Sequence, residues 1–106
     1  MKVGIIGLGI MGSAYAKNLL QAGVSVSGAD PSIVSREYIE TIGGTVHLSV
    51  GPWITDCDLV IISVASTKVL ATVSKTLGKV VMPGQIVMET RTFAMVDTLA
   101  PKAAVH

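Results

Sequence analysis

The chain has 106 residues, of which 50% are hydrophobic and 14% are charged, and its formal net charge is +1 at pH 7. This length supports a single domain with a modest core. Lysine and arginine are scattered and aromatic residues make up 4% of the chain. The sequence therefore lacks the basic stripe and the stacking platform of a nucleic-acid-binding protein.

The single cysteine, Cys57, cannot form an internal disulfide and has no companion ligands at the spacing of a metal site. We therefore expect no bound metal, a buried structural role for Cys57, and a cytoplasmic protein. Soluble chains carry on average about 25% charged residues. The low charged fraction predicts apolar surface that a second domain or a second subunit covers, with a homo-oligomer as one arrangement.

The first part of the chain predicts a short strand, a tight turn and a helix. Residues 3–6 are apolar and end at a glycine, as in a buried strand. Apolar residues then recur at helical spacing over residues 11–22, and Gly23 ends the helix. Residues 3–16 carry no charge and are similar to a signal peptide, but glycines interrupt them and they are too short to span a bilayer. We expect no membrane partner.

Strands and helices continue to alternate along the rest of the chain. Four more strands are predicted over residues 24–29, 45–48, 59–64 and 85–89. Helices are predicted over residues 33–42, within 49–57, from Ser66 or Thr67 to Leu77, and over 93–100. This alternation implies parallel strands joined by right-handed crossovers. The expected fold class is therefore α/β, a doubly wound, three-layer parallel sheet of about five strands.

The turn after the first strand has the sequence Gly7-Leu8-Gly9-Ile10-Met11-Gly12. Between a strand and a helix, this GxGxxG pattern is typical of the dinucleotide-binding turn of a Rossmann-type fold. Gly7 permits the tight turn, Gly9 lets the backbone approach a pyrophosphate, and Gly12 lets the helix pack closely on the strand. Residues 7–12 are thus predicted to bind the cofactor at a helix N-terminus. The side chain of Met11 is expected to pack beneath the turn.

Asp30 ends the second predicted strand, and Pro31 and Ser32 follow it. A carboxylate at this position accepts hydrogen bonds from the adenosine ribose of NAD and repels the 2′-phosphate of NADP. Arg36 is the one basic candidate for that phosphate and lies some way into the next helix, so NAD is favoured over NADP. Asp30 is also suited to cap that helix, and the two roles are compatible. Residues 30–32 are predicted cofactor-binding residues.

Two ring side chains lie in and after the third predicted strand. Trp53 could stack against adenine, but a core or interface role is favoured because tryptophan usually packs. His47 has neither a carboxylate nor a nucleophile beside it in the sequence. It is therefore interpreted as a structural residue and not as a general base.

The Gly-Leu-Gly-x-Met-Gly turn and the opening residues 2–19 resemble the β-hydroxyacid dehydrogenases, which include 6-phosphogluconate and 3-hydroxyisobutyrate dehydrogenases. Residues 56–64 and 83–89 are similar to two later strands of that family. The resemblance covers nearly the whole chain, but only the cofactor half of a family member. It implies further NAD(P) contacts from Val64, Ala65, Ser66 and Thr92.

In that family the substrate-binding glycine-rich segment and the catalytic lysine lie beyond the region that this chain matches. The resemblance therefore implies that residues 1–106 are an N-terminal dinucleotide-binding domain, truncated before the C-terminal helical catalytic domain. It further implies NAD(P) binding for hydride transfer to or from a small hydroxy acid. We expect no catalytic residue in the chain and no turnover by it alone. Alternatives are a non-catalytic NAD(H)-sensing or interaction module, a prephenate or arogenate dehydrogenase, an imine reductase, and a flavin- or S-adenosylmethionine-binding protein.

Overall fold

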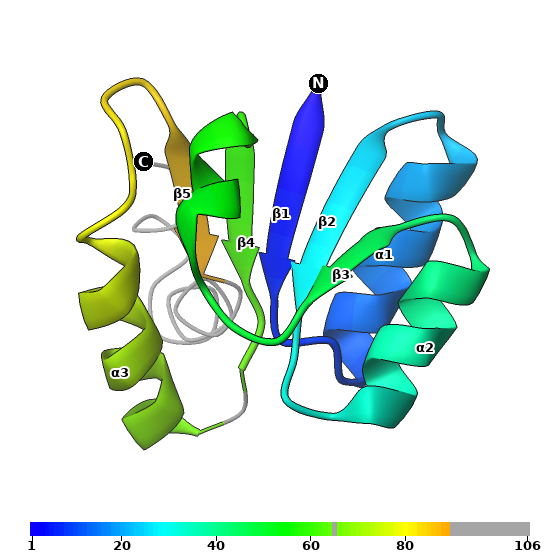
Figure 1. The fold of residues 1–106 in the computed structure, drawn as a ribbon, viewed down its shortest axis with the longest axis horizontal. Coiled ribbons are helices and arrows are strands. Elements are labelled where there is room, and N and C mark those ends of the chain that lie inside the picture. The colour runs from blue at the N-terminus through cyan, green and yellow to red at the C-terminus, as the bar shows by residue number, and fades with distance from the viewer. Residues whose placement is uncertain (65, 90–106) are drawn as a thin grey trace, which may run out of the picture.

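The computed structural model describes residues 1–64 and 66–89. Its elements are β1 (Lys2–Ile6), α1 (Ile10–Gln21), β2 (Ser25–Ala29), α2 (Ile33–Thr41), β3 (Thr45–His47), a short 3-10 helix η1 (Pro52–Asp56), β4 (Leu59–Ile62), α3 (Thr67–Leu77) and β5 (Ile86–Glu89). The five strands are parallel and lie in the order β3-β2-β1-β4-β5. Helices α1 and α2 lie together on one side of the sheet, with α3 on the other (Figure 1). The expected α/β fold is confirmed.

Two hydrophobic clusters lie on opposite faces of the sheet. One joins strand side chains to Ala16 of α1 and Ile39 of α2. The other joins strand side chains to Ile54 of η1 and to the end of α3. Because successive side chains of a strand point to opposite faces, Ile5 belongs to the first cluster and Ile6 to the second. The central strand β1 is thus buried on both faces, which explains its nearly continuous apolar sequence.

The direction in which the sheet is built reverses next to β1. The chain runs outward from β1 through β2 to β3, returns to the other side of β1 at β4, and continues to β5. Parallel register aligns Ile6 of β1 with Ala29 of β2 and with Ile62 of β4. The loops after these strands therefore emerge at one edge of the sheet. Open α/β folds bind their ligands at this carboxyl edge, beside such a reversal.

The predicted elements agree with the structure to within a few residues, with two differences of extent. The fourth strand ends at Ile62, so Val64 lies in the following loop. Residues 49–57 contain only the 3-10 helix Pro52–Asp56. The helix predicted over residues 93–100 lies outside the described residues. Within residues 1–64 and 66–89, no helix combines the length and the apolar character that a membrane span needs.

Apolar side chains remain at the surface of the described part of the chain, as the low charged fraction predicted. The edge strand β5 exposes Ile86, Val87 and Met88. Ile10, at the start of α1, is 92% exposed. The three exposed residues of β5 are consecutive in the sequence, whereas Ile10 is exposed singly, as is common on protein surfaces.

Candidate functional site

The glycine turn is built around two positions that exclude a side chain. Gly7 has a φ of +95°, a backbone conformation that L side chains rarely adopt, and a Cβ there would overlap the carbonyl of Ser63 after β4. A Cβ on Gly12 would overlap the carbonyl oxygen of Gly7. These two glycines are therefore needed to bring the start of α1 against the ends of β1 and β4.

Gly9 differs from both, because no atom of the described residues, apart from its two chain neighbours, lies within 4 Å of a Cβ built on it, and its φ is −72°. In the described part of the chain, no acceptor takes the N–H of Gly9, Ile10 or Met11. Helix α1 also has no side-chain cap and no acidic residue in its first turn. The turn is therefore an open surface of unpaired backbone donors at the positive end of a helix.

Leu8, and not Met11, packs beneath the turn. Leu8 is 1% exposed, and its methyl groups occupy the space that a side chain on Gly28 of β2 would need. Met11 is 54% exposed, so the prediction for its side chain is wrong. A helix rotates by about 100° per residue, and the contact of Gly12 with Gly7 and Ile5 turns Met11 away from the sheet.

Asp30 joins the glycine turn to the start of α2. Its Oδ2 accepts the N–H of Leu8 at 2.7 Å, and its Oδ1 accepts the N–H of Ser32 at 2.8 Å. The N-cap of α2 is Ser32, whose Oγ accepts the N–H of Ser35 at 3.3 Å, so the capping role considered for Asp30 belongs to its neighbour. Each carboxylate oxygen has two acceptor sites. The Asp30 carboxylate therefore keeps capacity for a ligand hydroxyl.

Arg36 lies closer to Asp30 than the sequence suggested. Its Nη1 donates a hydrogen bond to the backbone carbonyl of Asp30 at 2.8 Å. The side chains of a helix lean toward its N-terminus, and Arg36 lies in the first turn of α2. The long guanidinium side chain thus reaches back to the end of β2. Arg36, the one basic candidate for a 2′-phosphate, is thus held beside the end of β2 although it lies in the following helix.

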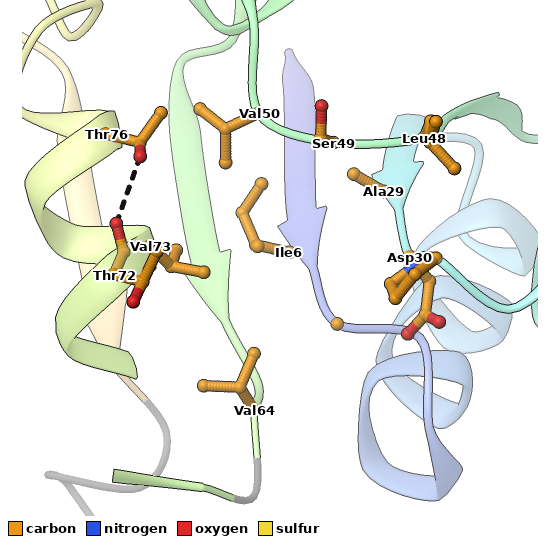
Figure 2. Close-up of a pocket in the computed structure, with 12 residues that line it drawn as sticks. Ile6, Ala29, Asp30, Leu48, Ser49, Val50, Val64, Thr72, Val73 and Thr76 are labelled. Atoms are coloured by element: carbon orange, nitrogen blue, oxygen red, sulfur yellow. Dashed lines mark hydrogen bonds between the residues drawn. The ribbon is translucent and has the colours of Figure 1, made fainter. Parts of the chain in front are cut away.

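A pocket of about 570 Å³ opens between the carboxyl edge of the sheet and α3 (Figure 2). Ile6 and Ala29 lie at the strand ends that face it. Residues 48–50 cross one side of it, and α3 closes another (Figure 2). The predicted site residues that line it are Gly7, Asp30, Pro31 and Val64. An apolar crevice with one carboxylate at its rim suits a flat, mostly apolar ligand group that carries hydroxyls on one side.

The remaining predicted contacts divide into two groups. Ser66 is the N-cap of α3, and its Oγ accepts the N–H of Val69 at 3.3 Å. Ala65 and Thr92 lie outside the described residues. The loop after β4 therefore contributes Val64 to the pocket, while Ser66 fixes the start of the helix that forms its wall.

Sequence reasoning missed two walls of the pocket. One is the segment 48–50 after β3, and the other consists of Thr72, Val73 and Thr76 on α3. Thr76 donates its hydroxyl to the Thr72 carbonyl at 3.0 Å (Figure 2). Thr72 in turn donates to the Lys68 carbonyl at 3.2 Å. The spacing of the threonines at positions i and i+4 was the available signal, because it places both on one helix face.

His47 and Trp53 form a parallel stack beside the pocket, with ring centroids 4.4 Å apart and an interplanar angle of 2°. Burial, and then the positive charge of Lys2, lowers the pKa of His47. Cys57 is 3% exposed, which confirms its buried role, and burial raises the pKa of its thiol. The indole Nε1 of Trp53 donates to the Ser49 carbonyl at 2.9 Å. These contacts agree with the structural roles expected of His47 and Trp53.

Known proteins match both the sequence and the fold. Residues 2–105 match the family model described as the NAD binding domain of 6-phosphogluconate dehydrogenase. A 3-hydroxyisobutyrate dehydrogenase from Mycobacterium tuberculosis has a TM-score of 0.78 and 24% identity, over 83% of this chain and 30% of that chain. A 3-hydroxyisobutyrate dehydrogenase from Salmonella typhimurium has a TM-score of 0.74 and 28% identity, over 84% of this chain and 32% of that chain.

An imine reductase from Pseudomonas sp. also has a TM-score of 0.74 and 28% identity, over 83% of this chain and 31% of that chain. The chain therefore spans about a third of the length of these solved proteins. The family model, in contrast, spans nearly the whole chain, including the glycine turn, Asp30 and all five strands. The chain belongs to the family of the NAD-binding domain of 6-phosphogluconate dehydrogenase, as its resemblance to the β-hydroxyacid dehydrogenases implied.

Proposed function

We propose that this domain binds NAD(H) across the carboxyl edge of its sheet, with the pyrophosphate on the turn at Gly9. The observation that carries the assignment is the open space in front of Gly9, beside backbone N–H groups that lack an acceptor among the described residues. The positive end of α1 stabilises an anion at this place. Gly7 and Gly12 are required by the packing of the protein itself, whereas the absence of a side chain at Gly9 serves the ligand.

Asp30 and the adjoining pocket would hold the adenosine half of the cofactor. The acceptor sites that remain on the Asp30 carboxylate suit the ribose hydroxyls. The adenine would occupy the apolar pocket between residues 48–50 and α3. The volume of about 570 Å³ lies within the usual range for small-molecule sites.

We favour NAD over NADP because the negative charge of Asp30 opposes a phosphate on the ribose 2′ position. Arg36 has the opposite effect on the cofactor preference, because its positive guanidinium is held at the Asp30 carbonyl and would attract the 2′-phosphate of NADP. The Asp30 carboxylate accepts from both the turn and the start of α2, so it stays at the ribose position. Asp30 also favours a hydroxyacid dehydrogenase over the NADPH-preferring imine reductases.

The proposed reaction of the whole protein is hydride transfer to or from a small hydroxy acid. The nicotinamide supplies the hydride chemistry when the cofactor is bound, and the protein positions it. An acid–base group must also reach the substrate oxygen. In the family that the chain resembles, this group is a catalytic lysine of a helical domain beyond the matched region. The residues described here would therefore bind and orient the cofactor, and the second domain would supply the catalytic group.

Calorimetric titration of the chain with NAD⁺, NADH, NADP⁺ and NADPH tests this proposal. Gly9→Val fills the space in front of the turn and should weaken NADH binding at least about tenfold, with a stability cost of about 1 kcal/mol from the altered helix cap. Gly78→Ala is the control, because Gly78 is exposed at the C-cap of α3 and has an ordinary helical φ. It should bind NADH as the wild type does.

Two outcomes would contradict the proposal. Undiminished NADH binding by Gly9→Val would remove the pyrophosphate assignment. Tighter binding of NADPH than of NADH by the wild-type chain would remove the preference for NAD. In that case Arg36→Ala should restore the preference for NADH, because Arg36 carries the cation nearest to the Asp30 carbonyl.

A further inference from the structure

We propose that Trp53 is a positioning residue for the adenine site, because it fixes the segment 48–50 that forms one wall of the pocket. This inference rests on the proposed NAD(H) function. Trp53 does not line the pocket itself. It contacts the ring of His47 and the backbone of Ser49, which lie on either side of Leu48 in the sequence.

The contacts of Trp53 bracket Leu48. Its ring stacks on His47 at a centroid distance of 4.4 Å, and its Nε1 donates to the Ser49 carbonyl at 2.9 Å. Leu48 is 64% exposed and lines the pocket. Figure 2 shows Leu48, Ser49 and Val50 in sequence along the segment that crosses above the strand ends. A single indole thus holds both ends of the turn that presents Leu48.

The segment has little other support. Among the hydrogen bonds of the described residues, the one from Trp53 is the only one that reaches the backbone of residues 48–50. The adjacent bonds lie outside it, from the Asp30 N–H to the His47 carbonyl and from the Ile54 N–H to the Gly51 carbonyl. The wall therefore depends on Trp53 for its one fixed polar contact, in addition to the packing of Val50.

Trp53 is itself held by the strand that ends at the glycine turn. A Cβ on Gly4 of β1 would lie 3.1 Å from Cζ3 of Trp53 and 2.9 Å from Sγ of Cys57. The bare backbone of Gly4 therefore lets the indole approach β1 closely. Because β1 continues into Gly7, the same strand carries the pyrophosphate turn at its end and supports the adenine wall from its side.

The wall suits a neutral, flat group. Leu48, Ser49 and Val50 carry no charge, and the α3 residues that face them across the pocket are Thr72, Val73 and Thr76. A base that enters between these surfaces gains affinity only when the gap matches its thickness, since dispersion forces fall off steeply with separation. If residues 48–50 shift, the affinity for the base therefore falls, while the phosphate-binding turn keeps its structure.

Two fragment ligands separate this role from a general effect on folding. AMP needs the adenine wall, whereas inorganic pyrophosphate needs only the glycine turn. Trp53→Phe keeps a ring for the His47 stack but removes the indole N–H. It should weaken AMP binding by about three- to tenfold, the loss expected for one hydrogen bond, and leave pyrophosphate binding unchanged. His47→Phe, which keeps the stack, should bind AMP as the wild type does, and His47→Ala should not.

Ile61→Val provides a matched control, because Ile61 is 7% exposed in the cluster on the opposite face of the sheet. It lowers stability without touching the wall, and its AMP-to-pyrophosphate affinity ratio should equal that of the wild type. Equal losses of AMP and pyrophosphate affinity in Trp53→Phe, or no loss of AMP affinity, would overturn the positioning role. Failure of the wild-type chain to bind NADH at all would instead overturn the proposed function, and the inference with it.

Discussion

Asp30 accepts the backbone N–H of Leu8 in a hydrogen bond of 2.7 Å that joins residues 22 positions apart in the sequence. Leu8 is the second residue of the glycine turn, and its side chain is buried over Gly28 of β2. Its backbone is therefore fixed to Asp30, directly after β2, and its side chain is packed on β2 itself. The residue proposed to bind the ribose thus also sets the shape of the turn proposed to bind the pyrophosphate.

Asp30→Ala should lower both stability and NADH affinity. It leaves the N–H groups of Leu8 and Ser32 without their acceptor, which should cost about 1–3 kcal/mol in the free energy of unfolding. NADH affinity should fall while the ratio of NADPH to NADH affinity rises, because the charge that opposes the 2′-phosphate is gone. Urea denaturation and calorimetry measure the two effects. An unchanged affinity ratio would argue against the ribose role, even if stability falls.

Gly12→Ala and Gly9→Ala should separate folding from binding. A methyl group on Gly12 overlaps the Gly7 carbonyl, whereas a methyl group on Gly9 meets no atom of the described residues beyond its chain neighbours. We expect Gly12→Ala to lose about 1–3 kcal/mol of stability or more through overpacking, and Gly9→Ala to lose at most about 1 kcal/mol. Thermal melting measures both. Equal destabilisation by the two variants would contradict the division of roles between these glycines.

Trp53 should report directly on cofactor binding. It is the only tryptophan of the chain, and it contacts the segment that lines the pocket. Reduced nicotinamide absorbs light where tryptophan emits, so bound NADH should quench the Trp53 fluorescence by energy transfer. Excess AMP should restore the emission if it displaces the adenine half. A fluorescence titration that shows no quenching at NADH concentrations at which calorimetry detects binding would place the cofactor away from Trp53.

Stability should depend on pH through His47. Its pKa in the folded state lies below its ordinary value of 6.5, first because of burial and second because of Lys2. The unfolded chain therefore binds a proton more readily than the folded chain, and this group lowers stability as the pH falls below about 6.5. His47→Phe should lose less stability than the wild type between pH 7.5 and pH 5.5. Identical losses in urea denaturation at the two pH values would contradict this contribution.

Much of the architecture followed from local patterns. Short apolar runs separated by helical spacing predicted five strands and the doubly wound sheet, because each strand that is buried on both faces must be apolar along its length. The glycines of residues 7–12 predicted the turn, since a tight exit from a strand and a close helix contact need positions without a side chain. The boundaries of β4 and of the helical turn within 49–57 differ from the prediction, because they depend on where packing ends.

The candidate site was only partly visible in the sequence. The position of Asp30 directly after the second predicted strand indicated a cofactor-binding role. Its hydrogen bond to Leu8, however, needs a register between β1 and β2 that no local pattern specifies. The reach of Arg36 and the orientation of Met11 depend on how each helix is rotated against the sheet. Side-chain direction along a helix decides what a residue contacts, and position in the sequence does not specify it.

The sequence by itself determined the chain of elements, the glycine turn and the acidic end of β2, because these follow from backbone conformation and from burial along a single segment. The tertiary structure alone decided which side chains meet across the carboxyl edge. The pocket draws its walls from the segment after β3, from α3 and from the glycine turn, and Trp53 bridges β1 to the segment after β3. Contacts between such distant segments exist only once the sheet has assembled in the order β3-β2-β1-β4-β5.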